Sequence, residues 1–136
     1  MADPSAASGP RPRPLSPHLQ IYRWTPTMAG SIVHRATGLA LAGGMAFLAW
    51  WLVAAASGYQ AYEFFSMVAS SLVGKVVLFG LVWSLSFHLL AGTRHLIWDL
   101  GYGYQPRAAN AWGVVIFAAS IAIAAAVFAL GYGAGA

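Results

Sequence analysis

Imidazole and guanidinium groups interrupt two long apolar runs of this sequence. The first run opens with "SIVHRATG", residues 31–38, and the second contains "HLLAGTRH", residues 88–95. Ionisable side chains in an apolar span are costly and are usually retained for a function. Imidazole ligates metals and transfers protons near neutral pH, and guanidinium donates several hydrogen bonds. These two stretches are therefore the places where the chain could do chemistry.

In the second run, small residues and imidazoles share one helical face. Ser84, His88, Ala91 with Gly92, and His95 follow one another at helical spacing. The small residues leave room beside His88 for a flat, bulky group or for the backbone of another helix. Haem fits the first alternative, because its iron takes imidazole as an axial ligand. The second alternative makes His88 a buried imidazole that hydrogen-bonds to a neighbouring helix.

A haem site built on His88 would be incomplete within this chain. His88 and His95 stand about 10 Å apart along one helix, so they cannot ligate the same iron. His34 is expected too close to the cytoplasmic end of its span to face His88, which is expected near mid-membrane. A second axial ligand would therefore come from another chain, which predicts a partner subunit.

In the first run, polar side chains share a helical face with small ones. Ser31, Arg35, Gly38 and Ala42 lie at helical spacing. Ser31 offers a hydroxyl and Arg35 a permanent cation with several donors, and together they match the two carbonyl oxygens of a quinone. The alternative is that Arg35 only contacts lipid phosphate or marks the cytoplasmic side of the membrane.

The elements that must position these residues are membrane-spanning helices. Hydrophobic residues make up 60% of the 136-residue chain and charged residues only 7%, whereas soluble domains carry about a quarter charged residues. A span needs roughly 20 apolar residues. Three runs meet that length: residues 29–56, 68–99 and 109–130. We expect an all-α membrane protein in which these spans form one transmembrane domain, 29–136, after an extended cytoplasmic segment, 1–28.

The connection between the first two spans and the basic residues complete the topology. The connection "YQAYEFFSM", residues 59–67, is expected to form a helical turn or two along the membrane interface. All six arginines precede the first span, open it, or flank the connection between the second and third spans: Arg11, Arg13, Arg23, Arg35, Arg94 and Arg107. Because basic residues favour the cytoplasmic side, the N-terminus is expected inside and the C-terminus outside.

The net charge of +4 is interpreted as this topology signal and not as a nucleic-acid site. The first 28 residues lack the apolar stretch of a secretory signal and are too rich in proline for the amphipathic helix of a mitochondrial transit peptide. A bacterial inner membrane is therefore favoured over a mitochondrial one.

Several kinds of chemistry are excluded by composition. Cysteine is absent, which rules out disulfides, thiolate metal sites and iron–sulfur ligation by this chain. The only acids, Asp3, Glu63 and Asp99, are scattered, and neither a serine–histidine–acid set nor a phosphate-binding glycine loop is present. Any reaction must be electron or proton transfer through a bound cofactor, or must be carried out by partners.

Three motifs together resemble one family. They are "RPLSPHLQIY" at 13–22, "SIVHRATG" at 31–38 and "HLLAGTRHLIWDLG" at 88–101. Their order, the H-x-x-x-G-x-R-H spacing and the three-span plan resemble the cytochrome b membrane-anchor subunit of succinate dehydrogenase, respiratory complex II. The resemblance runs from about residue 13 to the end of the second span, and the third span matches only in length and polarity.

The resemblance implies a cofactor and a substrate site. It makes His88 an axial ligand of haem b, with the other ligand supplied by a second membrane-anchor subunit in a shared helical bundle. It lines the ubiquinone pocket with residues near the start of the first span: Trp24, Met28, Ser31, Ile32 and Arg35. It places three side chains near the haem propionates: His34, Arg35 and His95.

The resemblance also implies partners and an activity. The chain would anchor the flavoprotein and iron–sulfur subunits, with Pro14 to Leu19 contacting the iron–sulfur subunit, and would help pass electrons from succinate to ubiquinone. Two alternatives remain open at this point. One is the anchor of a quinol:fumarate reductase, and the other is a passive anchor or small transport-related subunit without a cofactor.

Overall fold

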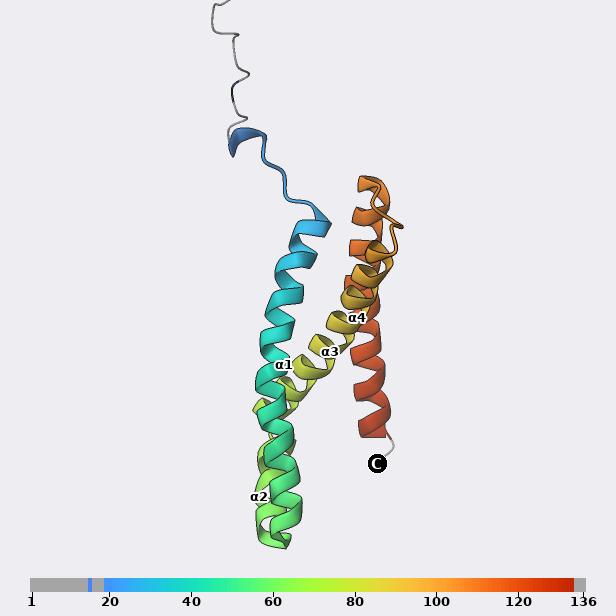
Figure 1. Cartoon of the computed structure of the whole chain (residues 1–136). Helices are drawn as coiled ribbons and strands as arrows, with labels where there is room; N and C mark the ends of the chain where they lie inside the picture. Colours follow the sequence, from blue (N-terminus) through green and yellow to red (C-terminus); the bar gives the residue numbers. More distant parts are fainter. Residues whose placement is uncertain (1–14, 16–18, 134–136) are drawn as a thin grey trace, which may run out of the picture.

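The computed structural model describes Leu15 and residues 19–133 of the chain. Within these residues the fold is helical and contains no strand (Figure 1). The elements are η2 (Leu19–Ile21), α1 (Pro26–Ser57), α2 (Tyr59–Ser70), α3 (Leu72–Asp99) and α4 (Pro106–Gly133). Three of them, α1, α3 and α4, are long and apolar enough to cross a membrane. The expected all-α membrane fold with three spans is confirmed.

α1 begins three residues before the expected span because its first turn is capped. Thr25 has extended backbone angles, and its side-chain oxygen accepts a hydrogen bond from the Met28 amide at 3.3 Å. Pro26 follows at the first helical turn, where its missing N–H leaves no bond unmade. α1 ends at Gly58, whose φ of 104° is a conformation that favours glycine.

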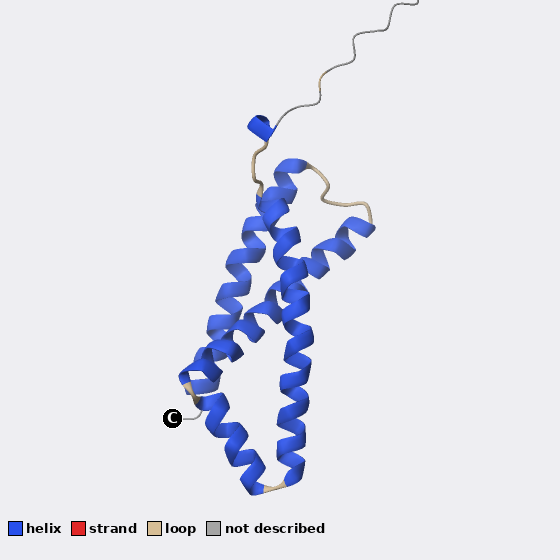
Figure 2. Cartoon of the chain, turned by 90° about the vertical axis from the view of Figure 1, so that its left-hand side faces the viewer, coloured by secondary structure: helices blue, strands red, loops and turns tan. Residues whose placement is uncertain are grey.

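α2 differs from the expected turn or two along the interface. It is a 12-residue helix that turns back after Gly58 at an angle to α1 (Figure 2) and contacts the end of α1 through aromatic side chains. The Phe65 ring lies 4.9 Å from the Trp50 ring and 5.2 Å from the Phe47 ring, measured between centroids. These aromatic contacts give α2 a partner helix, so it is longer than an unsupported connection would be.

The second span begins at Leu72 and not at Val68, because the chain breaks at Ser71. Ser71 has an extended ψ of 161°, and its hydroxyl oxygen accepts a hydrogen bond from the Gly74 amide at 3.1 Å. Ser71 therefore ends α2 and caps α3 at the same time.

One end of the bundle gathers the start of α1, the end of α3 and the start of α4 (Figures 1 and 2). The Thr27 hydroxyl donates to the Asn110 side-chain oxygen at 2.8 Å, which ties α1 to α4 at this end. Four arginines of the described residues lie here: Arg23, Arg35, Arg94 and Arg107. We name it the basic end, and the positive-inside rule predicts that it faces the cytoplasm.

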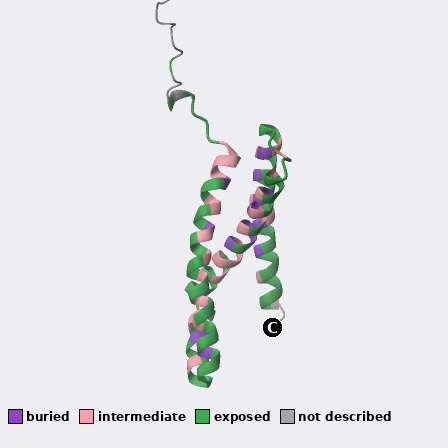
Figure 3. Cartoon of the chain, in the orientation of Figure 1, coloured by how far each residue is buried: buried purple, intermediate pink, exposed green. Residues whose placement is uncertain are grey.

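The core of the described chain is small. Phe87, Ala91 and Ile116 form its buried cluster between α3 and α4, and the Trp83 indole donates to the Ser120 hydroxyl at 3.2 Å beside it. Most other large apolar side chains are exposed on all the spanning helices (Figure 3). In a membrane protein such surfaces face lipid or a partner subunit.

Of the predicted contact segment Pro14 to Leu19, the structure describes Leu15 and Leu19. Pro14 and residues 16–18 lie outside the described residues, and so do the first 13. Leu15 and Leu19 are exposed, and Leu19 opens the single turn of η2. The extended cytoplasmic segment and its contact with a soluble partner stay predictions.

Gly74→Ala is expected to destabilise the chain. A Cβ at this position would collide with the backbone carbonyl oxygens of Val68 and Ala69, which can move only if the break at Ser71 is reshaped. Overpacking of this kind costs typically about 1–3 kcal/mol. The control is Gly80→Ala in the same helix, where a Cβ would meet no atom within 4 Å. Thermal unfolding in detergent should show a lower midpoint for Gly74→Ala alone, and equal midpoints would contradict the expectation.

Candidate functional site

Three of the predicted site residues form one histidine cluster between α1 and α3. The His34 ring stacks on the His88 ring, with centroids 4.0 Å apart and planes at 13°, and lies 5.1 Å from the His95 ring. The expectation that His34 could not face His88 is therefore wrong. The reason is that α3 crosses α1 at an angle (Figure 1). The crossing brings together two residues that would lie at different depths if the helix axes were aligned.

His88 is held through one ring nitrogen. Its Nδ1 lies 3.2 Å from the His34 carbonyl oxygen and 3.3 Å from the Thr37 hydroxyl oxygen. A carbonyl oxygen only accepts, so Nδ1 carries the hydrogen. The Thr37 hydroxyl already donates to the same His34 carbonyl at 2.9 Å, which leaves its oxygen free to accept as well. Nε2 of His88 therefore keeps its lone pair, and it makes no hydrogen bond with the described residues.

Glycines set the space on either side of His88. A Cβ at Gly38 would lie 3.1 Å from Cε1 of His88, so α1 approaches the imidazole as closely as it does because residue 38 has no side chain. A Cβ at Gly92, one turn further along α3, would meet nothing within 4 Å. The predicted room beside His88 therefore lies on the Gly92 side.

The other two histidines are arranged differently. Nδ1 of His95 lies 2.7 Å from the Ala91 carbonyl oxygen, one turn earlier in α3, and donates to it for the same reason. Nε2 of His34 is buried without a hydrogen-bond partner among the described residues. These residues contain no group of three or more metal-ligating side chains that could hold an ion. The His34 ring stacks on the His88 ring and is tilted against the His95 ring, and the three imidazoles do not form a site for one metal ion.

The predicted quinone residues lie on the exposed side of α1. Ser31, Ile32 and Arg35 are all exposed, and Ser31 and Arg35 are one helical turn apart as expected. Met28 is half-buried one turn earlier, and its sulfur accepts a hydrogen bond from the Tyr22 hydroxyl at 3.7 Å. Trp24 precedes the helix and is 68% exposed. The structure brings these residues to one surface of the basic end without enclosing them.

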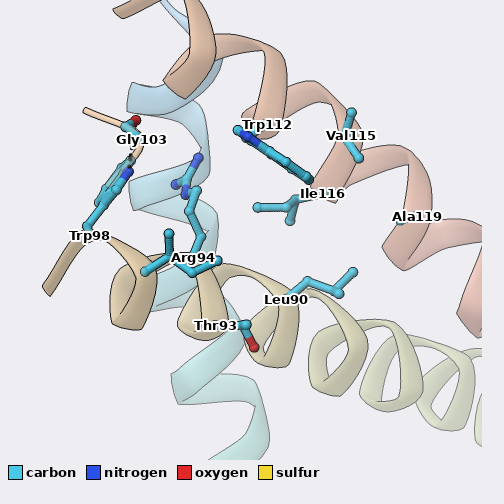
Figure 4. A pocket seen from close by; sticks show the side chains of 10 residues that line it. Leu90, Thr93, Arg94, Trp98, Gly103, Trp112, Val115, Ile116 and Ala119 are labelled. Atoms are coloured by element: carbon cyan, nitrogen blue, oxygen red, sulfur yellow. Dashed lines mark hydrogen bonds between the residues drawn. The ribbon is translucent and has the colours of Figure 1, made fainter. Parts of the chain in front are cut away.

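Sequence reasoning gave no role to two residues that the structure places in or beside the cluster. Thr37 is 2% exposed and contacts both His34 and His88. Its position three residues after His34 was the available signal, because a threonine hydroxyl reaches the carbonyl one turn back in a helix. Arg94 is 7% exposed, and its guanidinium carbon lies 4.5 Å above the Trp98 ring (Figure 4). Sequence alone identified Arg94 as a topology marker.

The sequence matches a known family over most of its length. Residues 9–127 fit the family model described as succinate dehydrogenase/fumarate reductase transmembrane subunit. The chain belongs to this family. The match reaches through most of α4, so it extends further than the resemblance of the motifs, which ended with the second span.

Named relatives agree with the motifs. The chain is 43% identical over 112 residues to the succinate dehydrogenase cytochrome b556 subunit of Paracoccus denitrificans, covering 82% of this chain and 86% of that protein. It is 38% identical to the subunit of the same name from Rickettsia felis, covering 80% and 85%. It is 39% identical to the mitochondrial succinate dehydrogenase cytochrome b560 subunit of Sus scrofa, covering 76% and 63%.

These findings confirm two expectations. The resemblance to the cytochrome b anchor subunits of succinate dehydrogenase is confirmed by the family and by the names of its members. The bacterial relatives and the three spanning helices support a multi-pass protein of the bacterial inner membrane.

Proposed function

We propose that this chain is a haem b membrane anchor of succinate dehydrogenase and forms part of its ubiquinone-reduction site. One observation supports the proposal: His88, which opens the H-x-x-x-G-x-R-H motif, is hydrogen-bonded through Nδ1 and keeps the lone pair of Nε2 free. An imidazole oriented through its second nitrogen is the usual state of a histidine that ligates iron or another metal. The names of the cytochrome b relatives support haem b as the group concerned.

The donor set fits a haem that is shared with another chain. His88 supplies one axial nitrogen, and the open Gly92 side gives room for a flat macrocycle. When bound, the haem would supply one-electron transfer. His34 would offer its buried Nε2 to a polar group of the haem such as a propionate. His95, whose ring lies 5.1 Å from the His34 ring, and Arg35, which follows His34 in α1, would also contact the propionates.

A second membrane-anchor subunit is proposed to pack beside His88. The neighbouring face of α3 is apolar and exposed: Leu85, Leu89 and Leu96, with Gly92 between them. At ~100° per residue these side chains lie next to His88 on the helix, so a helix packed on them could supply the second axial ligand. The flavoprotein and iron–sulfur subunits would bind at the basic end, where α1 begins shortly after the predicted contact segment Pro14 to Leu19 in the sequence.

His88→Ala is expected to abolish the low-spin haem spectrum of the purified complex, because it removes an axial ligand. His95→Ala is the matched variant in the same helix and should leave iron ligation intact, because the His95 imidazole lies about 10 Å further along α3. Reduced-minus-oxidised optical spectra test both. Wild-type bands in His88→Ala would show that another residue ligates the iron.

Thr37→Val is expected to weaken haem binding while the low-spin bands remain. It removes the hydroxyl that supports Nδ1 of His88 but leaves the His34 carbonyl in place. Loss of such an outer contact typically lowers affinity about tenfold or more. Ser86→Ala is the control, since the Ser86 hydroxyl only donates to the Val82 carbonyl within α3. Haem content per complex after dilution in detergent is the measurement, and equal retention in both variants would contradict the role of Thr37.

The quinone site is proposed on the exposed side of α1 at the basic end. Ser31 would donate a hydrogen bond to one quinone carbonyl, and Arg35 would stabilise negative charge that develops as the quinone is reduced. Trp24, Met28 and Ile32 would pack against the ring. Because Ser31 and Arg35 are exposed in this chain, the remaining walls would come from the partner subunits.

Ser31→Ala is expected to slow succinate–ubiquinone turnover by about two- to tenfold, the effect of one lost hydrogen bond. Arg35→Leu should be slower still, and Arg35→Lys should recover only part of the rate, because lysine lacks the planar fork. Succinate oxidation by an artificial acceptor should stay unchanged. Ser57→Ala serves as control, since the Ser57 hydroxyl bonds only to the Val53 carbonyl at the far end of α1.

Two outcomes would count against this quinone site. Equal losses in both assays would indicate failed assembly of the subunits, and normal quinone kinetics in both the Ser31 and Arg35 variants would exclude the pocket. The relatives are named succinate dehydrogenase, which favours succinate oxidation over fumarate reduction as the direction. Succinate–quinone and quinol–fumarate rates measured side by side test that direction.

A further inference from the structure

Arg94 is a buried cation that the haem and quinone proposals do not use. Its side chain is 7% exposed, and its Nε and Nη1 atoms have no hydrogen-bond partner among the described residues. A Cβ at Gly30 would lie 3.6 Å from Nη2, so α1 covers the guanidinium on that side. The Trp98 ring holds it on another side, and the Trp98 N–H is itself bonded to the Gly103 carbonyl at 3.2 Å.

A pocket of about 180 Å³ opens beside this guanidinium, between α3, α4 and the connection that joins them (Figure 4). Arg94 and Trp98 line it from α3, and Trp112 and Ile116 face them from α4. Apart from Arg94 the lining is almost wholly apolar, and it continues along α4 to Ala119. Ala119 is 13 residues into α4, about 20 Å from its start at ~1.5 Å per residue.

This pocket lies on the α4 side of α3 and borders the histidine cluster, because the Trp98 ring that lines it contacts the His95 ring, with centroids 5.3 Å apart. Leu90 and Ile97, which line the pocket, project about 160° and 180° away from His88 at ~100° per residue. The pocket belongs to the α3–α4 side of the bundle, whereas the predicted quinone residues lie on α1.

The shape and charge of the pocket select the chemistry of its ligand. A buried guanidinium with free donors is strongly stabilised by an anion, and its fork matches two oxygens of a phosphate. The apolar groove that leads away from it suits a hydrocarbon chain, and two tryptophans at one end mark the depth of lipid headgroups. A free phosphate would use the cation but not the groove, and a neutral quinone would leave the charge uncompensated.

We propose that Arg94, Trp98 and Trp112 bind the phosphate end of an anionic phospholipid at the basic end. The phosphodiester accepts hydrogen bonds from the Arg94 guanidinium, and one acyl chain follows the groove between α3 and α4 toward Ala119. The basic end reinforces the preference, because Arg23, Arg35 and Arg107 add positive charge near the same membrane surface. The pocket of about 180 Å³ is too small for a whole phospholipid, so most of the lipid would lie in the bilayer.

Native mass spectrometry of the delipidated complex that contains this chain tests the site. The probes are phosphatidylglycerol, phosphatidylcholine and inorganic phosphate, each added at matched concentrations. Arg94→Met keeps the length of the side chain and removes its charge, and Ala119→Leu fills the groove while keeping Arg94. The exposed Arg107→Met, also at the basic end, is the control. The intact mass reports in the same spectrum whether each variant assembled.

We expect one phosphatidylglycerol to bind more tightly than phosphatidylcholine, and Arg94→Met and Ala119→Leu each to weaken it about tenfold or more. Arg107→Met should bind as the wild type does. If Arg94→Met fails to assemble, Ala119→Leu decides. Equal binding of the two lipids, equal losses in the Arg94 and Arg107 variants, unchanged binding in Ala119→Leu, or full displacement by inorganic phosphate would each overturn the proposal.

Discussion

A single close crossing of two helices holds the histidine cluster together. α1 and α3 meet at Gly38, where any side chain would press on the His88 ring. The backbones are close enough there for the His34 carbonyl and the Thr37 hydroxyl to reach Nδ1 of His88, and for the two imidazoles to stack. An imidazole in an apolar span needs such partners. The crossing supplies them to one nitrogen and leaves the other free for a ligand.

The same crossing gives α3 two different sides. On its histidine side α3 contacts α1 and also exposes the apolar residues Leu85, Leu89 and Leu96. A neighbouring side of α3 packs on α4 around Phe87 and Ile116. Helices in lipid gain little from apolar burial alone, so polar contacts matter in fixing α4. The bonds from Thr27 to Asn110 and from Trp83 to Ser120 do this at two levels. α3 therefore contributes to a region suited to a shared cofactor and to a region suited to lipid, and the two adjoin where the Trp98 ring contacts the His95 ring.

The sequence predicted the features that depend on local chemistry. The three spans follow from length and hydropathy, and the structure moves their ends by only a few residues where Thr25 and Ser71 act as caps. The common face of Ser31 and Arg35 follows from helical spacing alone. The stacking of His34 on His88 could not be predicted, because it depends on the angle between two helices and not on the depth of each residue. Arg94 was missed for a similar reason: its burial arises from Gly30 and Trp98 closing over it, which no spacing rule reports.

The length of α1 has a mechanical consequence. Its 32 residues extend about 48 Å, roughly 18 Å more than the hydrocarbon thickness of a bilayer. The 12 residues of α2 also extend about 18 Å, and they run back beside the far end of α1. An upright α1 that started at the edge of the hydrocarbon would therefore carry this hairpin well beyond the opposite headgroup layer, which is only about 5–8 Å deep. With 28 residues α3 is also too long to cross upright. Hydrophobic mismatch thus favours the tilt that carries α3 across α1, and a bilayer of different thickness would alter how the two histidines meet.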